Sequence, residues 1–434
     1  MRPAATLIFL LALPAMLAAP AFGQEGDEQK LKMGDRDDAL KLKVNNAIRA
    51  GIDWLKSKQM PDGSWKGEWA KFAPPYQYPM GETALSLLAL LKSGVSRHDD
   101  CIKKGFEFLR PQPLKKTYEV SVLIMALQAL YADNKPAPVD HDELTRAVRK
   151  KVPIGGRDMD WMKECVRFLL ENRTSSMLLL NMETTDAQNF KDVWHYPMTC
   201  GDHSNTQFAI LGLKAASKCG IRIPEDVWIL TLKHFLRVQE ADGPEVRRWK
   251  LIEDRKHGYV SYKPLTQVPD HARGWCYGTT VLPKTGSADK ATATTGSMTC
   301  VGVSNLTIAL SELGRACPKS LRDKAETGVH DGMAWLDHNW KIDCNPHHPE
   351  KLWHYYYLYG LERVGVLTWS RHIGKHDWYR EGAEFLVAHQ QGGKWDDPNC
   401  PGPINNTCFA LLFLTRATVP GRMVITGQEH RRHR

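Results

Sequence analysis

Beyond Phe22, the 434-residue chain has no hydrophobic run long enough to cross a membrane. It also lacks a stripe of Lys and Arg interleaved with aromatic residues, although its formal net charge is +9. A nucleic-acid groove requires such a stripe, so nucleic acid is not an expected partner. The weakly basic balance is compatible with contact to an acidic envelope polymer instead.

Cysteine is sparse, with ten residues in the whole chain. This density excludes a fold that depends on a disulfide framework, although an exported chain can still form disulfides. Cys344 and Cys400 lie in comparable loops near the C-terminal end, and they are the pair we favour. Cys165 and Cys408 lie on apolar faces of expected helices, where a free thiol packs like a small hydrophobic residue.

The N-terminus has the features of a secretory signal peptide. A short positively charged start precedes an apolar run from Ala4 to Phe22, and small residues there fit cleavage near Gly23. An uncleaved anchor is the alternative, but the run is short and interrupted by prolines. We therefore expect residues 1–23 to be removed from a periplasmic or extracellular protein that then has no transmembrane segment.

The segments at the two ends of the mature chain are charged. Residues 24–43 are short of large apolar residues, which predicts a flexible lead-in. Residues 418–434 form a basic tail that we expect to be solvated and frayed.

Residues 44–417 alternate two kinds of expected helix. The first helix of each pair carries charged residues along one flank, whereas the second is apolar nearly all round. This alternation is satisfied when the first helices face solvent and the second helices are enclosed. The first helices lie near Gly51, Gly105, Cys165, Thr231, Gly332 and Gly382, and the second helices at 84–91, 118–130, 205–216, 304–313, 353–364 and 406–414.

The fourth pair contains a long insertion, about residues 242–297. It is rich in Gly, Pro, Thr and charged residues, with strand-like pieces at Tyr259–Tyr262 and Gly274–Tyr277. A loop of this length is usually functional or disordered, so a flap and a mobile surface excursion are both open.

The last apolar helix, Cys408–Leu414, has no polar flank although it lies close to the end of the chain. An open array of helix pairs needs polar end repeats, which this one lacks. Closure of the last pair onto the first would hide the apolar surface. The sequence therefore predicts an all-α fold, an α6/α6 toroid of six helix hairpins with a long loop insertion in the fourth repeat.

Two stretches of the chain share one motif: Gly51-x-x-Trp54-Leu55-x-x-x-Gln59 with Gly63-x-Trp65, and Gly382-x-x-Phe385-Leu386-x-x-x-Gln390 with Gly393-x-Trp395. Phe235 to Gln239 with Asp242-Gly243 is a weaker copy. The motif resembles the repeat of squalene and hopene cyclases and of protein prenyltransferase β-subunits. This resemblance to the terpenoid cyclase and protein prenyltransferase superfamily covers residues 44–417 and implies the α6/α6 toroid. It also implies that Gln59, Trp65, Gln390 and Trp395 are structural residues between outer helices.

The catalytic signatures that the resemblance implies are incomplete. The segment Asp35–Asp38 matches the Asp-x-Asp-Asp acid of terpenoid cyclases, but it lies in the expected solvated lead-in, whereas such an acid needs a dry pocket. Prenyl transfer implies a zinc site, yet Asn205 stands where its His would be, and Thr299-Cys300 has no Asp two residues before the cysteine. The run Cys200-Gly201-Asp202-His203 lacks the paired spacing of a zinc module. We expect no metal and no cofactor.

The six second helices should run in one direction, so that their N-termini gather at one rim. Helix N-termini favour anions and polar ligand groups. Capping explains many of the polar residues there, but not the accumulation of His, Tyr and acidic side chains. The ligand-binding candidates are Glu82, Glu119, Asp202, His203, Asn205, Gln207, His354, Tyr357 and Asn406.

Two functions follow from this arrangement. The leading one is an exported non-catalytic binding or scaffold module with a central polar-rimmed cavity, whose partner is a small molecule, a polysaccharide or an envelope protein. The alternative is an enzyme acting in that cavity, either terpenoid cyclase-like or polysaccharide-active, with Glu82, Glu119 and Asp202 as carboxylates. In an enzyme, Glu119, Asp202, His203, His354 and Tyr357 should converge on one open pocket, whereas in a scaffold they should be scattered or plugged.

Overall fold

The computed structural model describes residues 31–32, 36–67, 78–134, 151–173, 194, 202–254, 259–264, 269–278, 293–348, 352–397 and 402–417. The expected signal peptide with its cleavage point near Gly23 and the basic tail 418–434 lie outside these residues. So do Cys200 and Cys400, and the expected pairing of Cys344 with Cys400 therefore stays a prediction.

Helices make up most of the described chain, which confirms the all-α class. One set faces outward: α1 (Arg36–Ser57), α3 (Asp100–Leu109), α6 (Gly156–Glu171), α10 (Glu225–Val238), α12 (Lys319–His338) and α14 (Trp378–His389). The other set is enclosed: α2 (Pro79–Lys92), α4 (Thr117–Tyr131), α9 (His203–Lys218), α11 (Gly296–Leu313), α13 (His354–Leu367) and α15 (Pro403–Leu414). A short 3-10 turn, η2 (Gly314–Ala316), follows α11.

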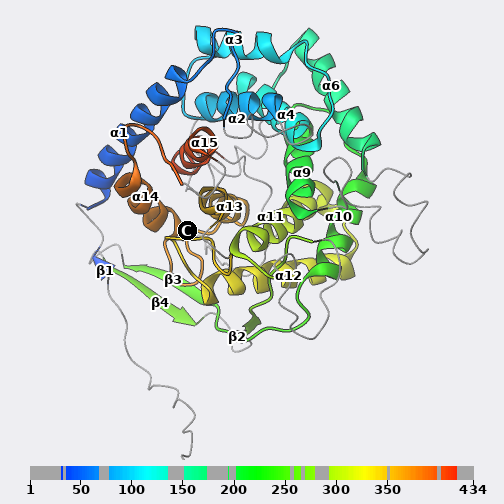
Figure 1. The fold of residues 1–434 in the computed structure, drawn as a ribbon. Coiled ribbons are helices and arrows are strands. Elements are labelled where there is room, and N and C mark those ends of the chain that lie inside the picture. Colours follow the sequence, from blue (N-terminus) through cyan, green and yellow to red (C-terminus); the bar gives the residue numbers. More distant parts are fainter. Residues whose placement is uncertain are drawn as a thin grey trace, which may run out of the picture.

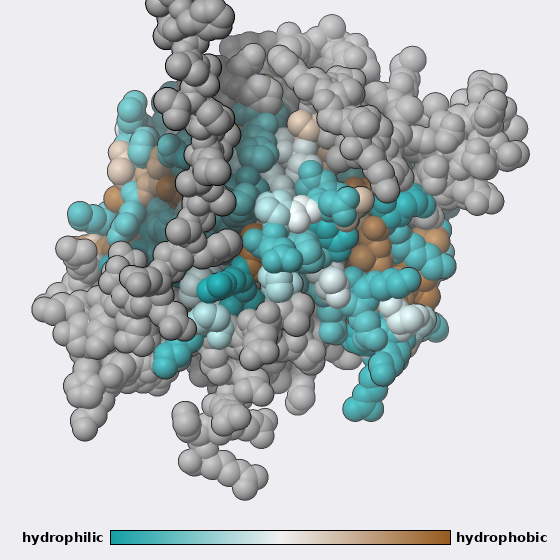
Figure 2. Space-filling view, turned by 90° about the horizontal axis from the view of Figure 1, so that it is seen from below, coloured by the Kyte–Doolittle hydropathy of each residue, from teal (hydrophilic) through white to brown (hydrophobic). Residues whose placement is uncertain are grey.

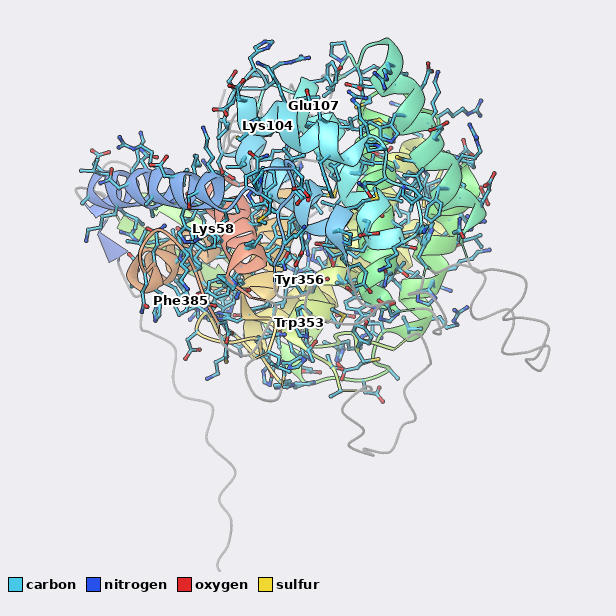
Figure 3. The ribbon with its side chains drawn as sticks, turned by 45° about the horizontal axis from the view of Figure 1, so that its top comes forward. Lys58, Lys104, Glu107, Trp353, Tyr356 and Phe385 are labelled. Carbon is cyan, nitrogen blue, oxygen red and sulfur yellow. The ribbon has the colours of Figure 1, made fainter. Side chains whose placement is uncertain are left out.

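The two sets differ in burial as their sequences predict. On the outer helix α3, Ile102 and Phe106 are buried, whereas Lys104 and Glu107 are exposed and point away from the molecule (Figure 3). On the inner helix α15, every residue from Ile404 to Leu414 is buried. The charged flank of the first helix in each pair therefore meets solvent, and the apolar second helix supplies the core.

The inner helices contact one another in chain order, and the last one packs against the first. Contacts join α2 to α4, α4 to α9, α9 to α11, α11 to α13, α13 to α15 and α15 to α2. Figure 1 shows this series on the inside, with the outer helices around it. Ser86 on α2 lies 3.7 Å from the sulfur of Cys408 on α15, although 322 positions separate the two residues. The apolar surface of α15 is thus covered by the start of the chain.

Two helix boundaries differ from the sequence-based expectation. Helix α1 begins at Arg36, so the expected flexible lead-in 24–43 is wrong for residues 36–43. Leu40 packs against the core there and extends the apolar stripe of Val44 by one turn. Helix α11 begins at Gly296, about two turns before the expected start of helix 304–313, and Thr295 caps it by accepting from the Met298 N–H.

The insertion contains short antiparallel strands. Strand β3 (Trp249–Asp254) pairs with β4 (Tyr259–Pro264), β4 pairs with β1 (Leu31–Lys32), and β2 (Glu245–Val246) pairs with β5 (Asp270–His271). The expected strand at Tyr259–Tyr262 is confirmed as part of β4. The expected strand at Gly274–Tyr277 is wrong, because this segment makes only an isolated bridge, Cys276 with Thr294, and it buries Trp275 between helices.

On the face that Figure 2 shows, the described residues are mainly hydrophilic. This view is from below that of Figure 1, and in it hydrophilic residues surround smaller hydrophobic areas. Among the described residues, no helix is both long and apolar enough to cross a bilayer. Cys165 and Cys408 are free and buried, as their positions on apolar helix faces predict.

Candidate functional site

The N-terminal ends of four inner helices are held by a repeated contact that we call the tryptophan staple. In each copy a fully buried tryptophan donates its backbone N–H to a threonine hydroxyl in the first turns of the inner helix and its indole N–H to a carbonyl of the preceding outer helix. The four copies are Trp65 with Thr83 and Leu55, Trp194 with Thr206 and Leu169, Trp275 with Thr299 and Phe235, and Trp395 with Thr407 and Leu386. The motif predicted Trp65 and Trp395 as structural residues, whereas Trp194 and Trp275 were missed.

Three glutamines join successive outer helices beside these staples. The Gln59 side chain donates to the Cys101 carbonyl on α3 over 2.8 Å, and Gln239 donates to the Gly328 carbonyl on α12 over 3.0 Å. Gln390 donates to the Ala47 carbonyl on α1 over 2.8 Å. Because α1 is the first outer helix and Gln390 follows the last one, this bond connects the two ends of the outer layer.

The acidic candidates at the N-terminal ends accept from backbone groups. Glu82, only 1% exposed, accepts from the Gly67 N–H over 2.8 Å. Glu119 on the neighbouring helix α4 accepts from the Gly81 N–H over 3.3 Å. Burial raises the pKa of Glu119. These carboxyl groups therefore fix the connections into and between α2 and α4.

Asp202 is the N-cap of α9. Its carboxylate accepts from the Asn205 backbone N–H over 2.8 Å and from the Asn205 side-chain amide over 2.9 Å. Burial raises the pKa of Asp202 to about 6 despite these hydrogen bonds. Both candidate residues thus stabilise the start of the helix.

His203 belongs to a chain of hydrogen bonds between α9, α10 and the insertion. Its Nδ1 lies 2.6 Å from the Cys276 carbonyl and its Nε2 lies 3.0 Å from His234 Nε2, while His234 Nδ1 lies 3.0 Å from the Arg237 guanidinium. A carbonyl only accepts and a guanidinium only donates, so one proton arrangement satisfies every contact. Arg237 donates to His234, His234 donates to His203 and His203 donates to Cys276, with both rings neutral.

Burial favours this neutral state of the histidine pair. The pKa of His203 is lowered to about 4 by burial, and the pKa of His234 is lowered well below its usual value by burial, His203 and Arg237. The pair therefore ties the insertion to the helices when uncharged, and either ring loses an acceptor when it gains a proton.

Gln207 points inside the ring of inner helices. With its amide oriented to satisfy both neighbours, Gln207 donates to the Tyr356 hydroxyl over 3.1 Å and accepts from Arg363 Nε and Nη2 over 3.3 and 2.5 Å. The Arg363 guanidinium also lies over the Tyr359 ring, 4.0 Å from its centroid. The buried arginine is held by an amide and aromatic faces.

His354 and Tyr357 point away from this network. His354 Nε2 lies 2.9 Å from the Ile342 carbonyl, and the Tyr357 hydroxyl donates to the Lys341 carbonyl over 3.0 Å. His354 also packs edge-on against Phe385 of α14, with ring centroids 4.9 Å apart. In Figure 3, Tyr356 lies near the middle of the molecule and Phe385 lies on α14. The tyrosine that faces the interior is thus Tyr356, one position before the candidate.

The remaining candidate, Asn406, is fully buried, and its amide has no hydrogen-bond partner within the described part of the chain. Within the described part of the chain, the hydrogen bonds of the candidates go to different elements. Glu119 bonds to the start of α2, Asp202 to its own helix, His203 to the insertion, and His354 and Tyr357 to the segment before α13.

A cavity of about 40 Å³ lies at the opposite, C-terminal ends of the inner helices. At about 30 Å³ for each water molecule, it has room for about one. We call it the lysine cavity; it is lined by Leu88, Lys92, Met125, Gln128, Leu211, Lys214, Ala215, Lys218, Tyr359, Leu412 and Ala417. No candidate from the sequence lies in it. Last-turn lysines on apolar helices were the available signal, but they also match the usual preference for cations at helix C-termini.

The three lysines differ in depth. Lys214 is 4% exposed, whereas Lys92 and Lys218 are half-buried. Burial lowers the pKa of Lys214 to about 7 against the opposing effect of Glu312 and Glu362. Burial also lowers the pKa of Lys92 to about 8 and lowers that of Lys218. At neutral pH, the innermost amine is therefore present in both charged and uncharged forms.

Comparison with protein-family models gives no match for this chain, and comparison with curated proteins gives none either. Within the described residues, no three His, Cys, Asp or Glu side chains are placed to hold a metal ion together.

Proposed function

We propose that the chain is an exported, non-catalytic binding module built as an α6/α6 toroid of six helix hairpins, of the terpenoid cyclase and protein prenyltransferase kind. The ordered contacts among inner helices, with α15 against α2, support the toroid. The recurrence of the tryptophan staple supports a repeat origin. The signal-like N-terminal sequence supports export.

One observation carries the binding role. Among the candidates at the N-terminal rim, Glu82, Glu119, Asp202, His203 and Tyr357 make hydrogen bonds to backbone groups, so these polar atoms serve the scaffold. The lysine cavity at the other end instead combines charged side chains with apolar walls. Apolar walls with a few charged side chains are the usual lining of a binding site, and this composition supports the binding role.

Catalysis at the rim is the alternative. The raised pKa values of Glu119 and Asp202 favour it, because a raised pKa makes a carboxyl group better suited to act as a general acid. A structural role is the simpler account. Both carboxyl groups accept hydrogen bonds from backbone N–H groups, and burial alone is enough to raise their pKa values.

Product analysis distinguishes the two functions. The purified chain is incubated with squalene-like isoprenoids and with envelope polysaccharides, and we expect no turnover. Turnover that Asp202→Asn and His203→Ala both abolish, with each variant shown to be folded by circular dichroism, would overturn the proposal in favour of the enzyme.

A further inference from the structure

We propose that residues Cys276–Gly278 of the insertion form an acid-released strap over the start of α9, and that protonation of the histidine pair His203 and His234 detaches this strap while the inner helices stay folded. The inference goes beyond the proposed function, because it concerns a conformational change and not a ligand.

The strap is held against α9 by two consecutive residues of that helix start. The Cys276 carbonyl lies 2.6 Å from His203 Nδ1, and the Tyr277 carbonyl accepts from the His203 backbone N–H over 3.3 Å. Gly278 forms an isolated bridge with Asp202, whose carboxylate also bonds to the Tyr277 side chain. Both residues that hold the strap can therefore gain or lose a proton.

The chain before the strap is anchored more firmly than the strap itself. Trp275 is fully buried and donates its indole N–H to the Phe235 carbonyl. Glu240 accepts from the Gly274 N–H over 2.8 Å and from the Thr294 hydroxyl over 2.6 Å. The strap makes only isolated bridges, and its central residue is 42% exposed. Movement of the strap can therefore pivot at Trp275 without breaking a helix.

The closed arrangement has no place for an added proton. In the neutral pair, His203 Nδ1 donates to the Cys276 carbonyl, one proton lies between the two Nε2 atoms, and His234 Nδ1 accepts from Arg237. A further proton must go between the two Nε2 atoms or onto His234 Nδ1. In either place two donors face one another across 3.0 Å. Both rings are fully buried, so the added charge also lacks water.

The strap is the side from which water can reach the protonated pair. Helices α9 and α10 carry the two rings, and Phe235 packs against both of them, with ring centroids 5.1 and 5.2 Å apart. The strap covers the pair without belonging to a helix. Its release hydrates His203 and leaves the helical hydrogen bonds intact, so the strap should detach before the inner layer unfolds.

Asp202 opposes the two histidines. Its raised pKa, about 6 with the strap closed, means that protonation of this carboxyl group favours the closed strap. The lowered pKa values of His203 and His234 mean that their protonation favours the open strap. Because two histidines oppose one carboxyl group, the strap should open as the pH falls from about 6.5 toward 4.

The other charged or titratable groups around the pair come from the neighbouring elements. Within the described residues, α4, α6 and α11 add no charge that shifts the pKa of either histidine. The remaining groups are Arg237 on α10, Glu240 after α10, Tyr277 in the strap, and Tyr356 on α13, which faces Asp202.

Cysteine labelling compares the strap with the inner layer in one sample. Cys276 of the strap and Cys300 of α11 are both free and fully buried. The full chain is treated at pH 7, 6, 5 and 4 with dithiodipyridine, which reacts with thiols in acid as well as at neutral pH. Peptide mass spectrometry gives the rate at each cysteine, divided by its rate in the denatured chain at the same pH.

We expect the labelling rate of Cys276 to rise about ten-fold or more between pH 7 and pH 4, while that of Cys300 stays unchanged. A rate at Cys276 that does not change with pH would overturn the inference. So would an equal rise at Cys300, because the whole fold would then be opening.

Variants assign the effect to the histidine pair. Asp202→Asn removes the group that opposes release, so labelling of Cys276 should begin at a higher pH. His234→Phe keeps the ring volume and removes the donor that faces His203 Nε2, so release should shift to a lower pH. His338→Gln, at an exposed position of α12, is the matched control and should follow the wild type. If one variant does not fold, an unshifted profile in the other still overturns the inference.

Discussion

The two ends of the inner helices use buried polar residues in different ways. At the N-terminal ends, threonines, Glu82 and Asp202 bond to tryptophans and backbone groups. At the C-terminal ends, Lys92, Lys214 and Lys218 line a cavity. Polar residues occur at both ends, so the type of residue does not separate scaffold from site. What the lysines have in addition is a place in the lining of a cavity, and the comparison can be tested by substitution at each end.

The largest expected effect is at the rim. Trp275→Ala should lower the free energy of unfolding by ~3–5 kcal/mol, because it empties a fully buried site and removes the bond to the Phe235 carbonyl. Guanidinium denaturation measures the loss. Trp275→Phe keeps most of the volume and should cost less. A loss under ~1 kcal/mol for Trp275→Ala would show that the staple does not hold the rim.

The second largest expected effect is a loss of folding stability as the pH falls, which arises from the histidine pair at the N-terminal rim. The folded-state pKa of His203, about 4, lies below its unfolded value, so the stability it contributes is complete above pH 6.5 and is lost as pH falls toward 4. The full effect is about 3 kcal/mol. His234 titrates in the same direction. Asp202 opposes both, because its raised pKa makes protonation near pH 6 favour the folded state.

Denaturation at pH 7, 6, 5 and 4 measures this balance. We expect the wild type to lose stability over the series, since two histidines oppose one aspartate. Asp202→Asn should lose it more steeply and His203→Ala less steeply. Equal slopes for the three proteins would contradict the assigned protonation states.

At the lysine cavity, in contrast, a substitution should leave the stability unchanged or raise it. Lys214→Met should be neutral or stabilising at pH 7, by up to ~2 kcal/mol, because it removes the cost of burying an ammonium group. The folded pKa of Lys214 lies below its unfolded value, so the wild type should gain stability as pH rises above 7 while Lys214→Met should gain less. Thermal unfolding at pH 7 and pH 9 checks both. A strongly destabilised variant would make Lys214 a structural residue.

The smallest expected loss of folding stability is in the layer of outer helices. Gln390→Ala should cost about 1 kcal/mol, the usual worth of one hydrogen bond, because it leaves the Ala47 carbonyl without this donor. Gln391→Ala, at the exposed neighbouring position, is the control and should be neutral. Indistinguishable denaturation curves for the two variants would show that this bond does not stabilise the junction of α14 and α1.

Much of the helical layout could be predicted from the sequence. The charged flank of α3 and the unbroken apolar surface of α15 are local patterns, so both helices lie within a few residues of their expected positions. The start of α11 was missed because Gly296, Ser297 and Thr299 resemble loop residues, and only their burial between neighbouring helices makes them helical. The lead-in was misjudged because α1 begins with charged residues and its apolar stripe is sparse there.

The candidate site was less predictable, because the role of each residue depends on contacts between residues that lie far apart in the sequence. Trp275 follows Gln239 after most of the insertion, so the short motif spacing that revealed Trp65 does not apply. Tyr356 and Tyr357 are adjacent, and only the packing of α13 shows which one faces inward. The lysine cavity combines residues of α2, α4, α9, α13 and α15, which no sequence pattern brings together.

Everything proposed for the two ends requires that the last inner helix lies against the first. In Ser86→Cys, the new thiol would replace a hydroxyl 3.7 Å from the Cys408 sulfur. Mild oxidation followed by proteolysis between the two helices should leave their fragments joined until a reductant is added, while the wild type gives separate fragments. A folded variant whose fragments separate without reductant would contradict the account.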